Sequence, residues 1–239
     1  MRLSNPDGAA RDFKDYVAFK PEDIEGWLEW GDAELARAGE MRGEAALAAF
    51  LRAEQVDATD FRVPLGMARA RMAQKDWKKA LERLEAADLA AKHASADVYL
   101  ERAVCRVALG RHAPSLRDYS SALPLLERRL ENKRRSRAPA PAIDEEQALL
   151  AKTYYSRGRV LDFLVRSGEA LVDYQQACDL GHKDACTRLK LLRDAEPKPQ
   201  LEPPAAENEV RAPQEEAPKP KRRRRSKISD DSGDRIYGL

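Results

Sequence analysis

One spacing recurs four times along the chain and constrains its fold more than any other feature. A small residue is followed four positions later by a large ring or leucine, and three positions after that by another small residue. The four copies are Ala46-Phe50-Ala53, Ala80-Leu84-Ala87, Ser115-Tyr119-Ala122 and Ala170-Tyr174-Ala177. Offsets of four and seven place all three residues on one face of a helix. The small residues let a neighbouring helix approach closely, and the large residue fills the space between the two helices.

A further small residue lies upstream of each motif and indicates a preceding helix. Gly158, Ala103 and Ala68 each lie twelve residues before the first residue of their motif, and Gly31 lies fifteen before Ala46. The first residues of successive motifs are 34, 35 and 55 residues apart. Alanine, leucine, arginine and glutamate dominate the composition, which favours helix over strand. Short helices of this kind bury their apolar faces only by stacking on near-copies of themselves.

This pattern of paired helices resembles the tetratricopeptide repeat over roughly residues 9–185. The resemblance implies an all-α fold, a right-handed superhelical α-solenoid of antiparallel helix pairs. It also implies a non-enzymatic scaffold for protein–protein interaction. The last unit is similar to the Sel-like relative of this repeat.

The repeats divide the chain into five expected parts. They are a capping helix or half repeat in residues 1–22, three repeats in 23–127, a basic inserted loop in 128–146, a fourth repeat with a capping helix in 147–194, and a disordered proline-rich and basic tail in 195–239. The sequence allows either a long loop or a helix extension for this insertion. Its basic residues are Arg128, Arg129, Lys133, Arg134, Arg135 and Arg137. At the start, either a lone helix caps the array or the native chain begins upstream of Met1.

The first helices of such arrays line a concave groove, so the resemblance assigns binding residues to this chain. They are Arg62, Leu65, Arg69, Leu100, Glu101, Lys152, Tyr155 and Arg159. A mainly cationic groove with aliphatic patches predicts an acidic or extended peptide as the partner. Chaperone tails are not expected, because Asp32, Arg69, Val104 and Arg159 stand where the asparagines of the chaperone-binding clamp would be.

The cysteines and the cationic tail allow further interpretations. The resemblance implies a disulfide between Cys178 and Cys186, as in cysteine-rich secreted relatives, while two packed thiols in a reducing cytosol fit the lone Cys105 better. The tail carries Lys219, Lys221, Arg222, Arg223, Arg224, Arg225 and Lys227. These cations predict either a solubilising tail or, as the alternative function, an accessory factor that binds nucleic acid or an anionic membrane.

Motifs of other classes are missing from the sequence. There is no glycine-rich phosphate loop, no helix with paired histidines and no GxSxG sequence, so we expect no catalytic residue, cofactor or metal. No segment approaches the roughly 18 apolar residues of a membrane span. The first residues also lack the apolar core of a secretory signal, which predicts a cytoplasmic protein, or an exported one if the native start lies upstream.

Overall fold

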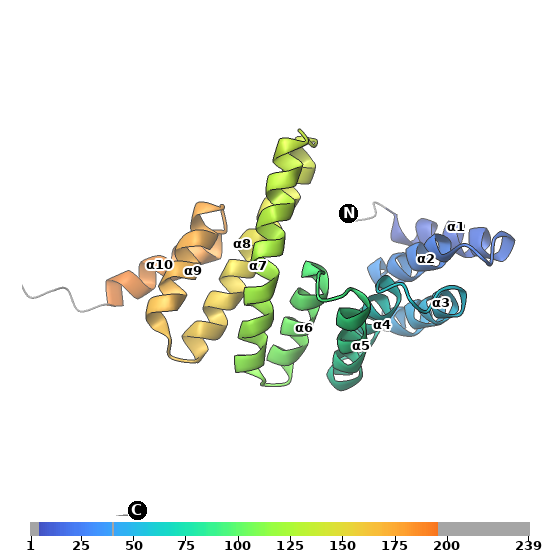
Figure 1. Cartoon of the computed structure of the whole chain (residues 1–239), viewed down its shortest axis with the longest axis horizontal. Coiled ribbons are helices and arrows are strands. Elements are labelled where there is room, and N and C mark those ends of the chain that lie inside the picture. Colours follow the sequence, from blue (N-terminus) through green and yellow to red (C-terminus); the bar gives the residue numbers. More distant parts are fainter. Residues whose placement is uncertain (1–4, 40, 196–239) are drawn as a thin grey trace, which may run out of the picture. The chain divides into compact units, whose positions relative to one another are not determined.

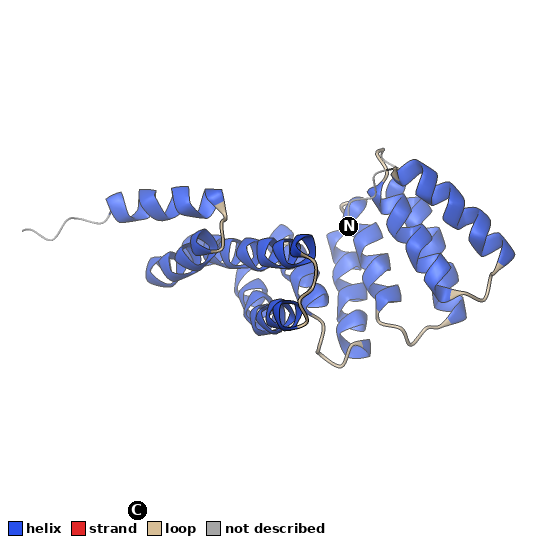
Figure 2. Cartoon of the chain, turned by 90° about the horizontal axis from the view of Figure 1, so that it is seen from above, coloured by secondary structure: helices blue, strands red, loops and turns tan. Residues whose placement is uncertain are grey.

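The computed structural model describes residues 5–39 and 41–195, and this part of the chain forms ten α-helices and no strand (Figure 2). The helices are α1 (Pro6–Phe19), α2 (Ile24–Ala36), α3 (Arg42–Val56), α4 (Arg62–Ala73), α5 (Trp77–Ala90), α6 (Ala96–Ala108), α7 (His112–Arg135), α8 (Ala140–Phe163), α9 (Ser167–Asp179) and α10 (Lys183–Ala195). Side chains cap several of them, for example Asp23 before α2 and Ser95 before α6. The expected tail lies outside the described residues.

Each helix packs against the next one in the chain, and the first helices α2, α4 and α6 also contact one another in order. Consecutive antiparallel pairs of this kind form an α-solenoid, as the sequence predicts (Figure 1). The exact unit boundaries given above remain a proposal. None of the described helices is both long enough and apolar enough to cross a membrane.

The large residue of each sequence motif occupies the same kind of position in its unit. Phe50 of α3, Leu84 of α5, Tyr119 of α7 and Tyr174 of α9 are all buried. Each belongs to a core cluster that also holds residues of the preceding and the following first helix. Tyr174, for instance, shares its cluster with Leu161 of α8 and Ala185 of α10. These equivalent positions confirm that the repeating spacing encodes contacts between neighbouring units.

Of the two possibilities left open for the insertion in residues 128–146, a long loop and a helix extension, the structure has the helix extension. Helix α7 continues to Arg135 and α8 begins at Ala140, so both helices are 24 residues long and only a short turn separates them. Pro139 and Pro141 do not prevent this, because they lie at the cap and in the first turn of α8, where no intrahelical N–H bond is lost. Figure 1 shows the two helices extending past the ends of their neighbours α6 and α9.

Candidate functional site

Corresponding side chains of the first helices form one continuous row across the units. Glu25, Arg62, Asp97 and Lys152 hold equivalent positions on α2, α4, α6 and α8, as do Asp32, Arg69, Val104 and Arg159. Two ion pairs join neighbouring members of this face. Glu25 Oε1 lies 2.6 Å from Arg62 Nη2, and Arg69 Nε lies 3.2 Å from Glu101 Oε1.

Three successive first helices line an open cleft on this face, with a volume of about 270 Å³. The cleft combines aliphatic side chains with charged and hydroxyl groups. The lining residues are Arg69 from α4, Asp97, Leu100, Glu101 and Val104 from α6, Tyr119 from α7, and Leu149, Lys152, Thr153 and Ser156 from α8. Burial raises the pKa of Tyr119, so its hydroxyl stays protonated and polar at neutral pH.

The cleft brings together four of the eight residues that the sequence assigned to a groove: Arg69, Leu100, Glu101 and Lys152. Arg62 lies at the start of α4, where it pairs with Glu25 and with Asp60. Leu65 is buried in the core with Leu84 and is not available to a partner. Its assignment to the groove was wrong, because the apolar side chain packs between helices instead of facing the open side.

Tyr155 and Arg159 lie on the other flank of α8. They line a neighbouring hollow together with Asp162, Phe163, Tyr174 and Arg188. The Tyr155 ring stacks on His182 with 4.4 Å between ring centroids. Helix α8 therefore forms a ridge with open space on both sides, and Lys152 and Arg159 are exposed along it.

The charge of this face is divided between its two ends rather than mainly cationic as expected. Arg62 and Arg69 are neutralised by ion pairs to carboxylates. Lys152 and Arg159 on α8 are exposed and form no ion pair within the described part of the chain. The first helices thus present unpaired cations at the α8 end of the row.

Acidic side chains occupy the opposite end. Glu25, Glu29 and Asp32 follow one another at helical spacing on α2, and all three are exposed. Desolvation raises the pKa of Asp32, although the nearby charge of Arg69 opposes the shift.

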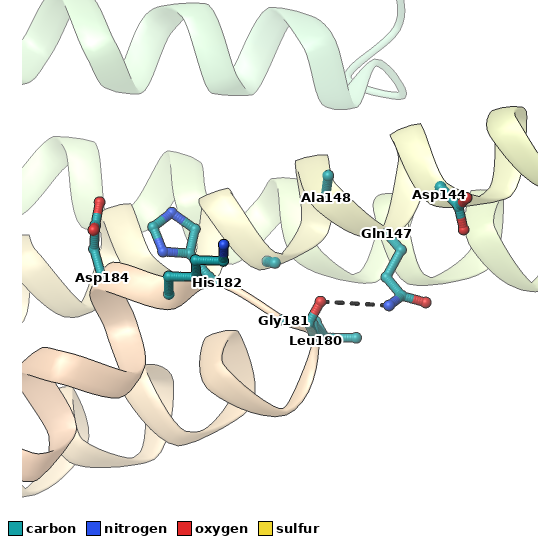
Figure 3. A pocket seen from close by; sticks show the side chains of 9 residues that line it. Asp144, Gln147, Ala148, Leu180, Gly181, His182 and Asp184 are labelled. Carbon is teal, nitrogen blue, oxygen red and sulfur yellow. Dashed lines mark hydrogen bonds between the residues drawn. The ribbon is translucent and has the colours of Figure 1, made fainter.

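A hollow of about 640 Å³ lies between α8 and the turn that joins α9 to α10 (Figure 3). Its walls come from Asp144, Gln147, Ala148 and Ala151 on α8 and from residues 180–184. Gln147 Nε2 donates a hydrogen bond of 3.4 Å to the Leu180 carbonyl oxygen across it. No local sequence pattern predicts this hollow, because α8 and the turn before α10 are separated in the chain by the whole of α9.

The cysteines occupy two different environments. Cys178 at the end of α9 and Cys186 in α10 are joined by a disulfide, with 4.7 Å between their Cα atoms. Cys105 is fully buried in α6, and burial raises the pKa of its thiol to about 12. A thiol that stays protonated in the core is a poor nucleophile. The described residues contain no cluster of three or more His, Cys, Asp or Glu side chains that could hold a metal ion.

Buried ion pairs between adjacent helices are a feature that the sequence analysis missed. Arg102 of α6 binds Asp88 of α5 at 2.6 Å and Asp118 of α7 at 2.9 Å. Arg157 of α8 binds Asp173 of α9 in the same way, at 2.7 Å. These charges sit inside the helix packing and fix the pairing of neighbouring helices, so they do not contribute to the open face.

Comparison with protein-family models and with curated protein sequences found no match. Solved structures do match. The crystal structure of MamA has a TM-score of 0.55 and 17% identity, covering 76% of this chain and 92% of MamA. A tetratricopeptide repeat protein from Parabacteroides merdae has a TM-score of 0.53 and 17% identity, covering 80% of this chain and 66% of that protein. At this identity the likeness shows the fold, which is that of a tetratricopeptide-type helical repeat array.

Proposed function

We propose that the cleft between α4, α6 and α8 binds an extended peptide segment of another protein, and that the segment carries carboxylates. The protein would then act as a scaffold for protein–protein interaction. The observation that carries this proposal is the cleft itself, which three units build together and which leaves aliphatic side chains beside an unpaired cation.

The lining suggests how such a peptide would be held. Val104 is 42% exposed, and Leu100 and Leu149 are half-buried, so an apolar side chain of the peptide can cover them. Burying one such side chain contributes about 1.5–3 kcal/mol. A carboxylate paired with the exposed Lys152 ammonium adds about 0.2–1 kcal/mol. These two contacts sum to roughly 2–4 kcal/mol, whereas a micromolar dissociation constant needs about 8 kcal/mol, so a segment has to engage the cleft at several positions.

Selection from a displayed peptide library on the full chain, followed by fluorescence anisotropy on the enriched peptides, tests this proposal. The double substitution Lys152→Glu with Arg159→Glu should weaken binding at least about tenfold. Lys152 lines the cleft and Arg159 continues the exposed row on the same helix, so both positions become like charges toward the peptide. Both side chains are exposed and unpaired, so the fold should be kept. Binding should also weaken as salt is added.

A matched control is available on the second helices. Lys78 of α5 and Arg117 of α7 are also exposed and unpaired, and both lie on second helices, outside the first-helix row that holds Lys152 and Arg159. Reversing both to glutamate makes the same change in net charge and should alter affinity less than about twofold. Equal weakening by the two double variants, or no weakening by either, would contradict a binding surface in the cleft.

A further inference from the structure

The cleft between α4, α6 and α8 continues into a second hollow along α6 and α8. The second hollow has a volume of about 200 Å³ and shares two lining residues, Tyr119 and Ser156, with the cleft. Val107 of α6 and Arg159, Val160 and Phe163 of α8 form most of its remaining wall. The cleft and the second hollow together form one slot between α6 and α8, and they meet at Tyr119 of α7.

The walls of the second hollow repeat those of the cleft at an interval of seven residues. Seven residues are about two helical turns, so the repeated positions lie on the same face of a helix and about 10.5 Å apart. Each half of the slot therefore has an aliphatic residue of α6 on one side and a cation of α8 on the other. The matching pairs are Leu100 with Val107 on α6, and Lys152 with Arg159, Thr153 with Val160 and Ser156 with Phe163 on α8.

Each half of the slot contains one cation that has no partner. Lys152 and Arg159 are exposed and form no ion pair among the residues that the structure describes. Asp97 and Glu101 in the cleft, and Asp162 on the other flank of α8, are each paired with an arginine already. A ligand with two carboxylates about 10.5 Å apart therefore has the charge and the spacing that this slot requires.

Apolar surface is exposed beside each cation. In the cleft, Val104 is 42% exposed, and in the second hollow Phe163 is 66% exposed. The Phe163 ring stacks on His112, the first residue of α7, with 4.0 Å between ring centroids. An apolar side chain of a ligand has surface to cover in both halves, so the two halves offer the same pair of contacts twice.

We propose that the slot between α6 and α8 binds a partner segment in which an acidic residue followed by an apolar residue recurs every three positions. The segment lies along the two helices in a left-handed extended conformation with three residues per turn. Such a chain advances about 3.1 Å per residue, so equivalent residues lie about 9 Å apart on one face, close to the separation of Lys152 and Arg159. This inference rests on the proposed function, because it specifies the peptide that the cleft binds.

The three directions of this conformation match the three surroundings of the slot. The acidic residue of each repeat points to the cation on α8, the apolar residue to the aliphatic wall on α6, and the third residue to solvent. A β-strand fits less well, because its residues three apart point to opposite faces. An α-helical ligand needs seven residues to cover the same distance, so the interval between the acidic residues distinguishes the conformations.

A set of synthetic peptides with one composition tests this interval. Each peptide has two Glu-Leu pairs in a glycine and serine background, with the glutamates two, three, four or seven positions apart. Length, net charge and apolar content are therefore the same throughout. Fluorescence anisotropy with the full chain should show the tightest binding at an interval of three, at least about fivefold tighter than at two or four. Tightest binding at any other interval, or equal binding at all of them, would overturn the proposal.

Substitutions in the protein test the two halves of the slot separately. Arg159→Gln removes the cation of the second hollow, so the peptide with two pairs should lose its advantage over a peptide with a single Glu-Leu pair. Lys152→Gln should have the same effect in the cleft. Arg117→Gln on α7 is the matched control, because this exposed arginine also forms no ion pair among the described residues, and it should leave the advantage unchanged. An advantage that survives in either slot variant would contradict joint binding by the two halves.

The proposed function and this inference fail in different ways. Library-selected peptides that bind the full chain, and that Lys152→Glu with Arg159→Glu weakens, support the peptide cleft. If the interval between acidic residues then has no effect on affinity, the cleft stands and the two-part slot is wrong. If neither selected nor synthetic peptides bind, the proposed function is wrong and this inference falls with it.

Discussion

At the scale of single residues, close approach between units depends on positions where no side chain fits. Gly31 of α2 and Gly66 of α4 both face the Phe50 ring, and a Cβ at either position would overlap it, at 2.5 Å for Gly31. Phe50 is buried in the cluster that joins these two first helices. Its size therefore sets the spacing of the first two units, and the glycines are part of the same packing.

Gly66→Ala should destabilise the protein by about 1–3 kcal/mol, because the added methyl group forces the ring or the helix to move. Gly168 of α9 provides the control, since a Cβ there meets nothing within 4 Å. Gly168→Ala should be neutral or stabilising by up to about 1 kcal/mol, as expected for alanine in a helix. Chemical denaturation of both variants measures the difference, and equal effects would contradict the packing argument.

The buried thiol of Cys105 predicts a pH dependence. Its pKa is raised to about 12 in the folded protein, whereas an unfolded cysteine titrates near about 8.5. The folded state therefore favours the neutral thiol. The stabilisation of the folded state by the neutral thiol is fully present below the unfolded pKa and is lost as pH rises toward 12. The free energy of unfolding should fall between about pH 9 and 11, and less so in Cys105→Ala. If the free energy of unfolding falls equally with pH in the two proteins, the thiol is not desolvated in the folded state.

At the scale of elements, the extension formed by α7 and α8 is held by a buried carboxylate. Glu146 of α8 accepts from Arg129 Nε at 2.6 Å and Lys133 Nζ at 2.7 Å, both on α7, and its side chain is only 4% exposed. Leu126, Leu130 and Leu150 form the apolar contact beside it. The extension is therefore a packed helix pair, although its sequence is rich in charge.

Glu146→Gln should cost about 1–3 kcal/mol, because Lys133 loses its carboxylate partner and Arg129 keeps only Asp97. The effect should be local. Hydrogen exchange of the amides in the last turns of α7 and the first turns of α8 should become faster than in α4 and α5. Gln147 is half-buried and carries no charge, so Gln147→Ala gives a comparison without loss of an ion pair. Uniform acceleration across the array would contradict a local role for Glu146.

At the scale of the whole molecule, the repeat was predictable because one spacing encodes one contact, repeated at Phe50, Leu84, Tyr119 and Tyr174. The site was predictable only in part. The periodicity places the side chains of the first helices on a common face. It does not show that Leu65, at the edge of that face, packs into the core. Pairing such as Arg69 with Glu101 joins residues 32 positions apart, and no local pattern reveals it.

The central claim is that partners bind on the first-helix face, and methyl NMR of the full chain with a selected acidic peptide tests it most directly. Leu100, Val104 and Leu149 line the cleft, whereas Leu89 of α5 and Val172 of α9 are exposed methyl groups on second helices. We predict that the peptide shifts or broadens the signals of the three cleft residues and leaves the other two unchanged. Shifts confined to Leu89 and Val172 would contradict the account.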